Sequence, residues 1–170
     1  MKKFLSLLLV LVFSLSALCA CGGSGDDNSA SEDASSVAAV LSCTVSELKD
    51  ELFELSSAGK DNMLESGEGA ILDNTGIAKE LYEEGFYASD VGGVSIETIM
   101  FFKAVDETAA ASIKAKLEAK NAEYVAQSKN YNEDNYAMAN NGVVEQRGVY
   151  VYMIISPKVS ELAAAITGKF

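Results

Sequence analysis

The chain has 170 residues, of which 49% are apolar, 22% charged and 8% aromatic, and an apolar share near one half is typical of a globular protein with a core. A formal net charge of −12 argues against nucleic-acid binding, because it repels a phosphate backbone. The absence of histidine excludes Ser/His and Cys/His nucleophile pairs and histidine metal sites.

The first twenty residues have the pattern of a secretory signal. Lys2 and Lys3 precede an uncharged run from residue 4 to residue 20 that is dominated by Leu, Val and Phe. A short positive head followed by an apolar segment is typical of a signal peptide. No basic stop-transfer cluster follows this run, which disfavours a retained spanning helix.

The run ends in Leu18-Cys19-Ala20-Cys21, which resembles the bacterial lipobox. The resemblance implies cleavage after Ala20 and a diacylglyceryl group on the thiol of Cys21. Two acyl chains anchor a protein stably, because each buried CH2 contributes about 0.8 kcal/mol. The predicted location is the extracytoplasmic face of the cell membrane; the alternative is ordinary cleavage after Cys19 or Ala20 and full release.

The residues after the signal divide into a linker and one domain. Removal of Lys2 and Lys3 makes the remaining chain more acidic, and the segment after Cys21 is rich in Gly, Ser and Asp, which is typical of a solvated tether. We therefore predict a signal peptide at 1–20, a lipidated cysteine and acidic flexible linker at 21–43, and a single domain at 44–170.

Periodicity and turn residues predict the elements of this domain. Thr44-Val45-Ser46-Glu47 has the spacing of a capping box, which marks a helix start. The predictions for the first half are a helix at 45–55, a loop at 56–74 with a short strand or turn at 63–64 and 70–72, a helix at 77–84 ended by Gly85, and a strand at 94–105 whose later half is buried on both faces.

The second half begins with Asp106, a good N-cap for the longest helix, and ends with Ser156-Pro157, predicted as the cap and first position of a last helix. The predictions here are a helix at 107–129, a polar loop at 130–135, a hairpin of strands at 143–146 and 149–155, and a helix reaching Gly168. This order lacks regular βαβ alternation and predicts an α+β fold, a small mainly antiparallel sheet with helices packed on one face.

Several segments together resemble a known family. They are the lipobox, the acidic linker, the strand from Ile96 to Lys103, Asn141-Gly142-Val143-Val144 and Gly148-Val149-Tyr150-Val151. They resemble small lipoproteins of low-GC Gram-positive bacteria that share a domain of unknown function (forty-three fifty-eight). The similarity covers about residues 44–170. It implies an extracytoplasmic lipoprotein, and no activity, cofactor or catalytic residue comes with it.

Three groups of residues are candidates for chemistry or binding. Two carboxylates held at a fixed separation can hydrolyse a glycosidic bond. Side chains with oxygen ligands at every second position can form the start of a calcium-binding loop. Tyrosine side chains can line a binding groove. The candidates are the acids Glu83, Glu84 and Asp90; the calcium-loop residues Asn130, Asn132 and Asp134, with Asn135 and Asn141 where the motif needs Gly and Glu; and Tyr124, Tyr131, Tyr136, Tyr150 and Tyr152.

The spacing of these residues favours binding over catalysis. Adjacent helical positions such as Glu83 and Glu84 would project about 100° apart, which suits a solvated face, and the calcium motif is incomplete. Cys43 lies between apolar neighbours and is predicted to be a small buried hydrophobe. Tyr150 and Tyr152 share a strand face, which is either an exposed binding surface or core.

The sequence therefore predicts a lipid-anchored binding or assembly module at the cell envelope, with no catalytic residue, cofactor or metal. Its partners would be the membrane, through the lipid on Cys21, and an envelope protein. One alternative is a small-ligand-binding component beside a membrane transporter or receptor, with the tyrosines as its site. The other is a carboxylate-dependent hydrolase acting on wall polymers.

Overall fold

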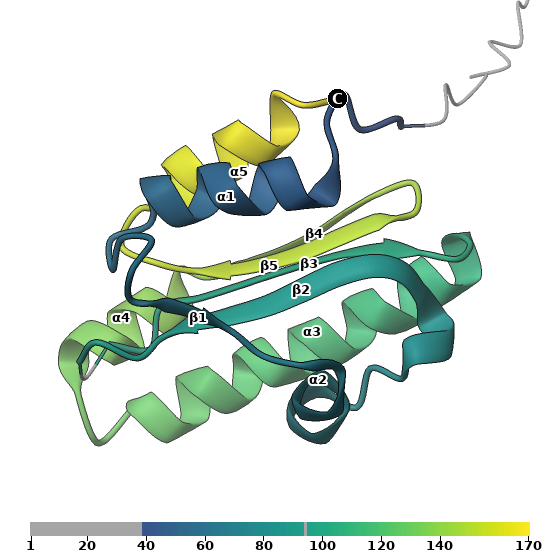
Figure 1. Cartoon of the computed structure of the whole chain (residues 1–170). Coiled ribbons are helices and arrows are strands. Elements are labelled where there is room, and N and C mark those ends of the chain that lie inside the picture. Colours follow the sequence, from purple (N-terminus) through teal and green to yellow (C-terminus); the bar gives the residue numbers. More distant parts are fainter. Residues whose placement is uncertain (1–38, 94) are drawn as a thin grey trace, which may run out of the picture. The chain divides into compact units, whose positions relative to one another are not determined.

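A computed structural model describes residues 39–93 and 95–170, and these residues belong to one compact unit. Five antiparallel strands form one sheet in the order β1-β2-β3-β5-β4, with helices on both faces (Figure 1). The elements are α1 (Val45–Leu55), β1 (Met63–Glu65), α2 (Glu68–Thr75), a 3-10 turn (Lys79–Leu81), β2 (Tyr82–Asp90), β3 (Thr98–Ala104), α3 (Glu107–Ser128), α4 (Glu133–Asn140), β4 (Val143–Arg147), β5 (Tyr150–Ile155) and α5 (Val159–Thr167).

The α+β class and the antiparallel sheet are confirmed, but the expectation of helices on one face is wrong. Alternate residues of a strand point to opposite faces. In β3, Phe101 packs in the cluster under α1 and α5, whereas Phe102 packs in the cluster against α3, and both are fully buried. A central strand that is apolar at every position needs cover on both sides.

The layer formed by α1 and α5 closes one face of the sheet. Helix α1 begins with the predicted capping box, in which the Glu47 N–H donates to Thr44 Oγ1 (3.1 Å) and the Thr44 N–H donates to Glu47 Oε2 (2.9 Å). Leu48 and Leu52 then lie on its buried face, and Leu162 of α5 packs in the same cluster. The capping box and the 3.6-residue period together fix this helix as predicted.

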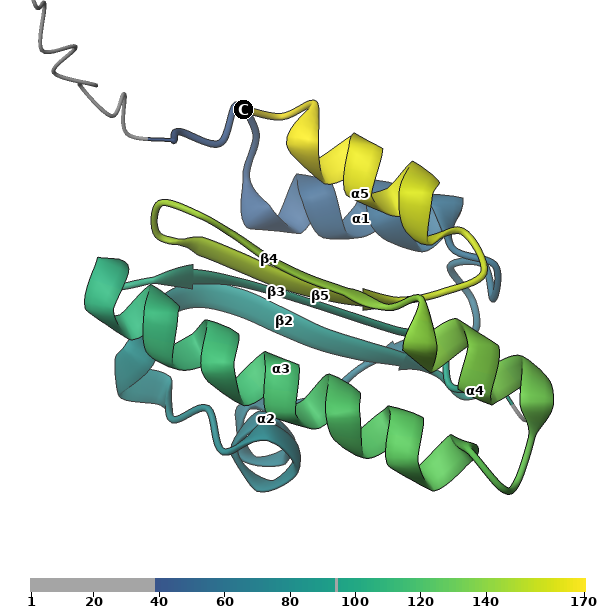
Figure 2. The same ribbon diagram turned by 180° about the vertical axis from the view of Figure 1, so that it is seen from behind.

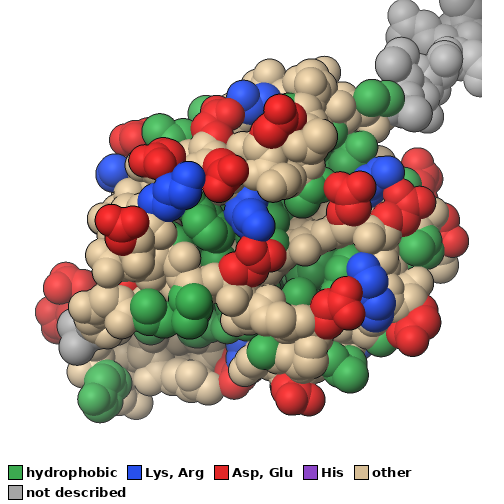
Figure 3. Space-filling model, viewed as in Figure 1, with side chains coloured by type: hydrophobic (Ala, Val, Ile, Leu, Met, Phe, Trp, Pro, Cys, Tyr) green, Lys and Arg blue, Asp and Glu red, His purple; other side chains and the backbone are tan. Residues whose placement is uncertain are grey.

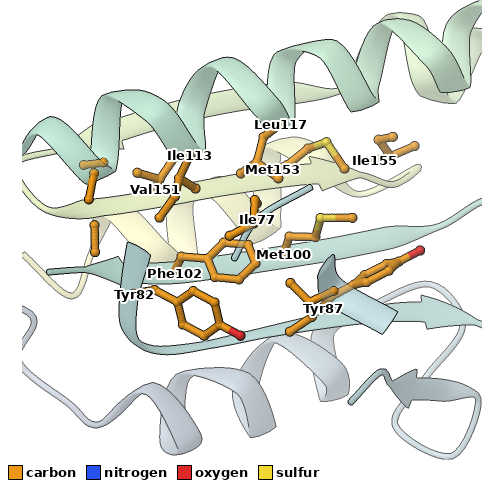
Figure 4. Close-up of a cluster of buried hydrophobic side chains, with 14 of the residues drawn as sticks. Ile77, Tyr82, Tyr87, Met100, Phe102, Ile113, Leu117, Val151, Met153 and Ile155 are labelled. Carbon is orange, nitrogen blue, oxygen red and sulfur yellow. The ribbon is translucent and has the colours of Figure 1, made fainter. Parts of the chain in front are cut away.

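Helix α3 covers the other face. Asp106 accepts a hydrogen bond from the Ala109 N–H (2.7 Å), which confirms the predicted N-cap. Figure 4 shows Ile113 and Leu117 of α3 directed at Val151 and Met153 of β5. Within the described residues no helix combines the length and the apolar character needed to cross a membrane.

Two predicted elements in the first half are wrong. The stretch predicted as a helix at 77–84 is a short 3-10 turn followed by the start of β2. Residues 68–75 form α2, although 56–74 were predicted as a loop with a short strand or turn at 70–72. Gly85 does not end a helix; it lies in β2 beside β3, where an added Cβ would be 2.7 Å from the Phe101 carbonyl oxygen. Pairing with β3 therefore overrides local helix propensity.

The second half differs from prediction at two helix starts. The polar loop at 130–135 is shorter than predicted, because Asn132 caps α4 by accepting a hydrogen bond from the Asn135 N–H (3.0 Å). Helix α5 begins at Val159 after Lys158, not at Pro157. Lys158 is the N-cap residue of α5, whereas the Ser156 hydroxyl accepts a hydrogen bond from the Lys158 N–H (3.0 Å) and donates one to the buried carboxylate of Glu97.

Candidate binding site at the edge strand β4

The β4–β5 hairpin places one strand at an open edge of the sheet. Gly148 adopts a positive φ of 54° in the two-residue turn, and Gln146 Nε2 donates to its carbonyl (3.0 Å). Glycine suits this left-handed conformation, which primed hairpin turns require. Because β5 pairs with β3 on its other side, β4 ends the sheet and has no strand beyond it among the described residues.

The register shows which groups of β4 face outward. Arg147 lies opposite Tyr150 and Glu145 opposite Tyr152. In a two-residue hairpin the pair that closes the turn exchanges hydrogen bonds, and such pairs alternate along an antiparallel ladder. The N–H and C=O groups of Val144 and Gln146 therefore point away from β5, toward the open edge.

A groove of about 640 Å³ lies beside this edge, between α3, α4 and β4. Figure 2 shows the molecule from the side of β4, with α3 beneath the strand. Its apolar wall includes Val125 of α3 and Val144 of β4, and charged residues Glu118 and Lys129 lie along α3. An edge strand beside an apolar groove with polar ends is suited to binding an extended peptide segment.

Asn121 lies in the wall of the groove. Its Oδ1 atom is buried and accepts no hydrogen bond from the described residues. An added Cβ at Gly142 would be 2.7 Å from Oδ1, so the carboxamide is in close contact with the backbone between α4 and β4. A buried acceptor without a donor costs about 1–3 kcal/mol, so Oδ1 is a destabilising feature of the groove wall.

A second pocket, of about 360 Å³, lies between α1, α2 and β2, but its cations already have partners. Lys49 Nζ lies 2.6 Å from Glu65 Oε2, and Lys79 Nζ lies 3.6 Å from Glu68 Oε1. Figure 3 shows acidic and basic side chains interspersed over this side of the molecule. The β4 edge is therefore the better candidate for binding.

The tyrosines proposed as a groove do not lie together. Tyr150 and Tyr152 are buried under α1 and α5, which confirms the interpretation of that strand face as core. Tyr131 is 90% exposed beyond the end of α3, and Tyr124 packs on the opposite face of the sheet, with its hydroxyl 3.3 Å from that of Tyr87.

The tyrosine hydroxyls at the rims of the core have hydrogen-bond partners. Tyr152 donates to Glu145 across the β4–β5 pair. The pKa of the Tyr152 phenol is raised mainly by burial and also by this hydrogen bond. The pKa of the Tyr87 phenol is raised mainly by burial and also by its hydrogen bond with Tyr124. Both phenols therefore remain protonated at neutral pH.

The three candidate acids are separated by the fold. Glu83 and Glu84 lie in β2 near its start, where Glu83 is 2.5 Å from Lys103 Nζ. Asp90 lies at the end of the same strand and accepts from the Gly92 N–H (2.6 Å). Glu84 and Asp90 are six positions apart in the strand, which is a separation of about 20 Å and too far for a pair of carboxylates to act on one glycosidic bond.

The residues proposed as a calcium-binding loop belong to helix α4 and its ends. Asn132 caps α4, Asp134 lies in its first turn and Asn141 follows its end. Within the described residues, no group of three or more His, Cys, Asp or Glu side chains could hold a metal ion. Cys43 is half-buried and packs against the α1/α5 cluster. Ala20 and Cys21 lie outside the described residues.

Sequence reasoning missed the β4 edge as a site, although it predicted the hairpin. The position of a strand within a sheet depends on which other strands pair with it, and the start of β2, at 82–84, was predicted as the end of a helix. The sequence showed only a short strand at 143–146, which begins with two valines, beside a glycine turn.

Comparison with known proteins identifies the family. Residues 56–156 match the family described as Domain of unknown function (DUF4358). The chain belongs to this family. The match runs from the end of α1 through all five strands to the residue after β5. No curated protein and no solved structure matches the chain.

Proposed function

We propose that this DUF4358 protein is a lipid-anchored, extracytoplasmic module of the cell envelope that binds a protein partner by adding an extended segment to β4. The observation that carries the binding role is an open edge strand beside the groove of about 640 Å³. The lipobox at Leu18–Cys21 supports the anchor. The proposal also includes an origin among small lipoproteins of Gram-positive bacteria.

Strand addition uses the groups that the edge presents. The outward N–H and C=O groups of Val144 and Gln146 would pair with the main chain of the partner, which provides affinity with little dependence on sequence. Side chains on the α3 side of the added strand would lie over the groove lined by Val125 and Val144, which provides selectivity. Binding of this kind needs no catalytic residue or cofactor.

The two alternatives have less support. The small-ligand interpretation depends on tyrosines that the fold disperses or buries. The hydrolase interpretation depends on acids that lie at opposite ends of β2.

We expect Cys21→Ser to release the full chain from the membrane. A hydroxyl cannot replace the thiol as the lipid acceptor of a lipobox, and the protein would then lose both acyl chains. Fractionation of cells into membrane and soluble material measures the effect, and mass spectrometry of the mature N-terminus identifies the modification. Cys19→Ser is the matched control and should remain with the membrane. Equal membrane association of Cys21→Ser and the parent would contradict the anchor.

We expect a photoreactive amino acid in place of Gln146 to form a protein adduct in intact cells, and Val144→Pro to lower its yield about tenfold. Proline removes an N–H that points outward, so it blocks strand addition without breaking the β4–β5 ladder. The same photoreactive residue at the exposed position 73 of α2 is the control. An unchanged adduct yield in a Val144→Pro variant that melts like the parent would contradict binding at this edge.

A further inference from the structure

We infer that the extended segment that pairs with β4 is β4 of a second copy of this chain, an inference that rests on the proposed binding at this edge. The observation behind it is a pair of opposite charges, Glu145 and Arg147, on one face of a five-residue edge strand. Both side chains are exposed. Such a strand can complement itself when two copies run antiparallel.

Symmetry limits the possible registers to a few. A two-fold axis perpendicular to the sheet keeps each side chain on its own face, so the axis must pass midway between one residue and its own symmetry mate, which pair with each other. Near the centre of β4 that residue is Val144, Glu145 or Gln146. An axis at Glu145 would set two carboxylates against each other, which is unfavourable.

The charges select the axis at Gln146. In that register Glu145 lies opposite the second copy's Arg147, and Arg147 lies opposite the second copy's Glu145. An axis at Val144 would instead place Glu145 opposite Val143 and leave both charges without a partner. The outward main chain of Gln146 would pair with its own symmetry mate through two hydrogen bonds, as an antiparallel ladder requires.

Contacts with neighbouring residues restrict the motion of both charged side chains. Tyr152 donates to the Glu145 carboxylate from the adjacent strand. The Arg147 guanidinium lies 5.6 Å from the ring of Phe170, a distance typical of a cation–π contact. Holding a side chain in place lowers the entropy cost of an ion pair across the interface.

The other edge of the sheet does not offer the same surface. Strand β1 has three residues, and its Glu65 already pairs with Lys49 (2.6 Å). A very short edge strand is one of the ways in which proteins avoid pairing with another sheet. Pairing through β4 alone closes a two-fold dimer and does not extend into a fibre.

The symmetry also agrees with the proposed anchor. Leu41 packs with the α1/α5 cluster, and the Ser42 N–H donates to the Lys169 carbonyl (2.8 Å), so the chain joins the fold on the α1/α5 side. A two-fold axis perpendicular to the sheet leaves this side of both copies facing the same way. Two copies paired in this manner can therefore be anchored in one membrane.

The first test is a disulfide across the two-fold axis in the full, membrane-anchored chain. In a Cys43→Ser background, Gln146→Cys should form a covalent species of twice the mass under oxidising conditions, because directly paired strand residues lie within the Cα separation that a disulfide accepts. Asp73→Cys, on an exposed helix far along the sheet, is the control. The Cys43→Ser chain alone gives the background.

The second test exchanges the charges in the Gln146→Cys chain. Glu145→Arg or Arg147→Glu alone should lower the yield of covalent dimer about tenfold, since like charges then face each other twice. The double exchange, Glu145→Arg with Arg147→Glu, restores complementarity and should restore the yield. Failure of the double exchange to recover the dimer would overturn the register.

The variants substituted at position 146 distinguish a failure of this inference from a failure of the proposed function. An adduct at position 146 that contains a different protein, without the homodimer, would overturn the second-copy partner and leave strand addition at β4 standing. No adduct of either kind at position 146 would overturn both.

Discussion

Replacing Glu97 with alanine is expected to lower the free energy of unfolding by about 3–5 kcal/mol. This side chain is 1% exposed. Its carboxylate accepts hydrogen bonds from the N–H groups of Ser57 (2.9 Å) and Ala58 (2.7 Å) and from the Ser156 hydroxyl. Glu97 therefore joins the ends of α1 and β5 to the start of β3, and its loss leaves three donors unsatisfied. Urea unfolding followed by circular dichroism measures the change.

Two milder substitutions show whether the hydrogen bonds cause the loss. Glu97→Gln keeps one oxygen but turns an NH2 group toward one backbone N–H, so we expect a smaller loss of about 1–3 kcal/mol. Ser156→Ala removes one donor and should cost about 1 kcal/mol. If Glu97→Ala unfolds at the same urea concentration as the parent, the buried carboxylate does not hold these segments together.

Phe101→Ala and Phe102→Ala are each expected to cost about 3–5 kcal/mol, because each removes a fully buried ring from a packed core. The rings lie on opposite faces of β3. Phe101 packs near Phe86 and Tyr150, with ring centroids 6.3 and 6.0 Å away, and Phe102 meets Tyr82 edge to face at 5.1 Å. Equilibrium unfolding of the two variants measures the contribution of each layer.

The comparison of these two variants tests the two-layer architecture. A sheet with one solvent-exposed face would make one of the substitutions nearly neutral, since a ring in water has little packing to lose. Val105→Ala, at a residue that is 47% exposed after β3, is the matched control and should cost less than about 1 kcal/mol. A loss in only one phenylalanine variant would contradict cover on both faces.

The candidate site shows where sequence reasoning reached its limit. The hairpin of β4 and β5 was predictable, because two apolar runs flank Arg147-Gly148 and glycine permits the turn. The openness of β4 was not predictable, because it depends on β3 pairing with the other side of β5. A strand does not carry in its own sequence the identity of its neighbours in the sheet.

The sequence by itself determined those elements whose signals are local. The capping box at Thr44, the N-cap at Asp106, the long periodic helix after it and the glycine turn at 148 are set by residues a few positions apart, and all appear in the structure. The strand predicted at 94–105, with its later half buried on both faces, also appears, as the shorter β3 at Thr98–Ala104. These features depend on short-range hydrogen bonds and side-chain periodicity.

Only the tertiary structure decided the elements whose conformation depends on distant partners. Residues 82–90 become a strand because β3 offers a backbone ladder and a close-packed site for Gly85, and at 82–84 this outweighs a local preference for helix. Helices occupy both faces because β3 and β5 expose apolar side chains in both directions. Burying those side chains stabilises the fold more than any local propensity, and no short window of sequence contains that contribution.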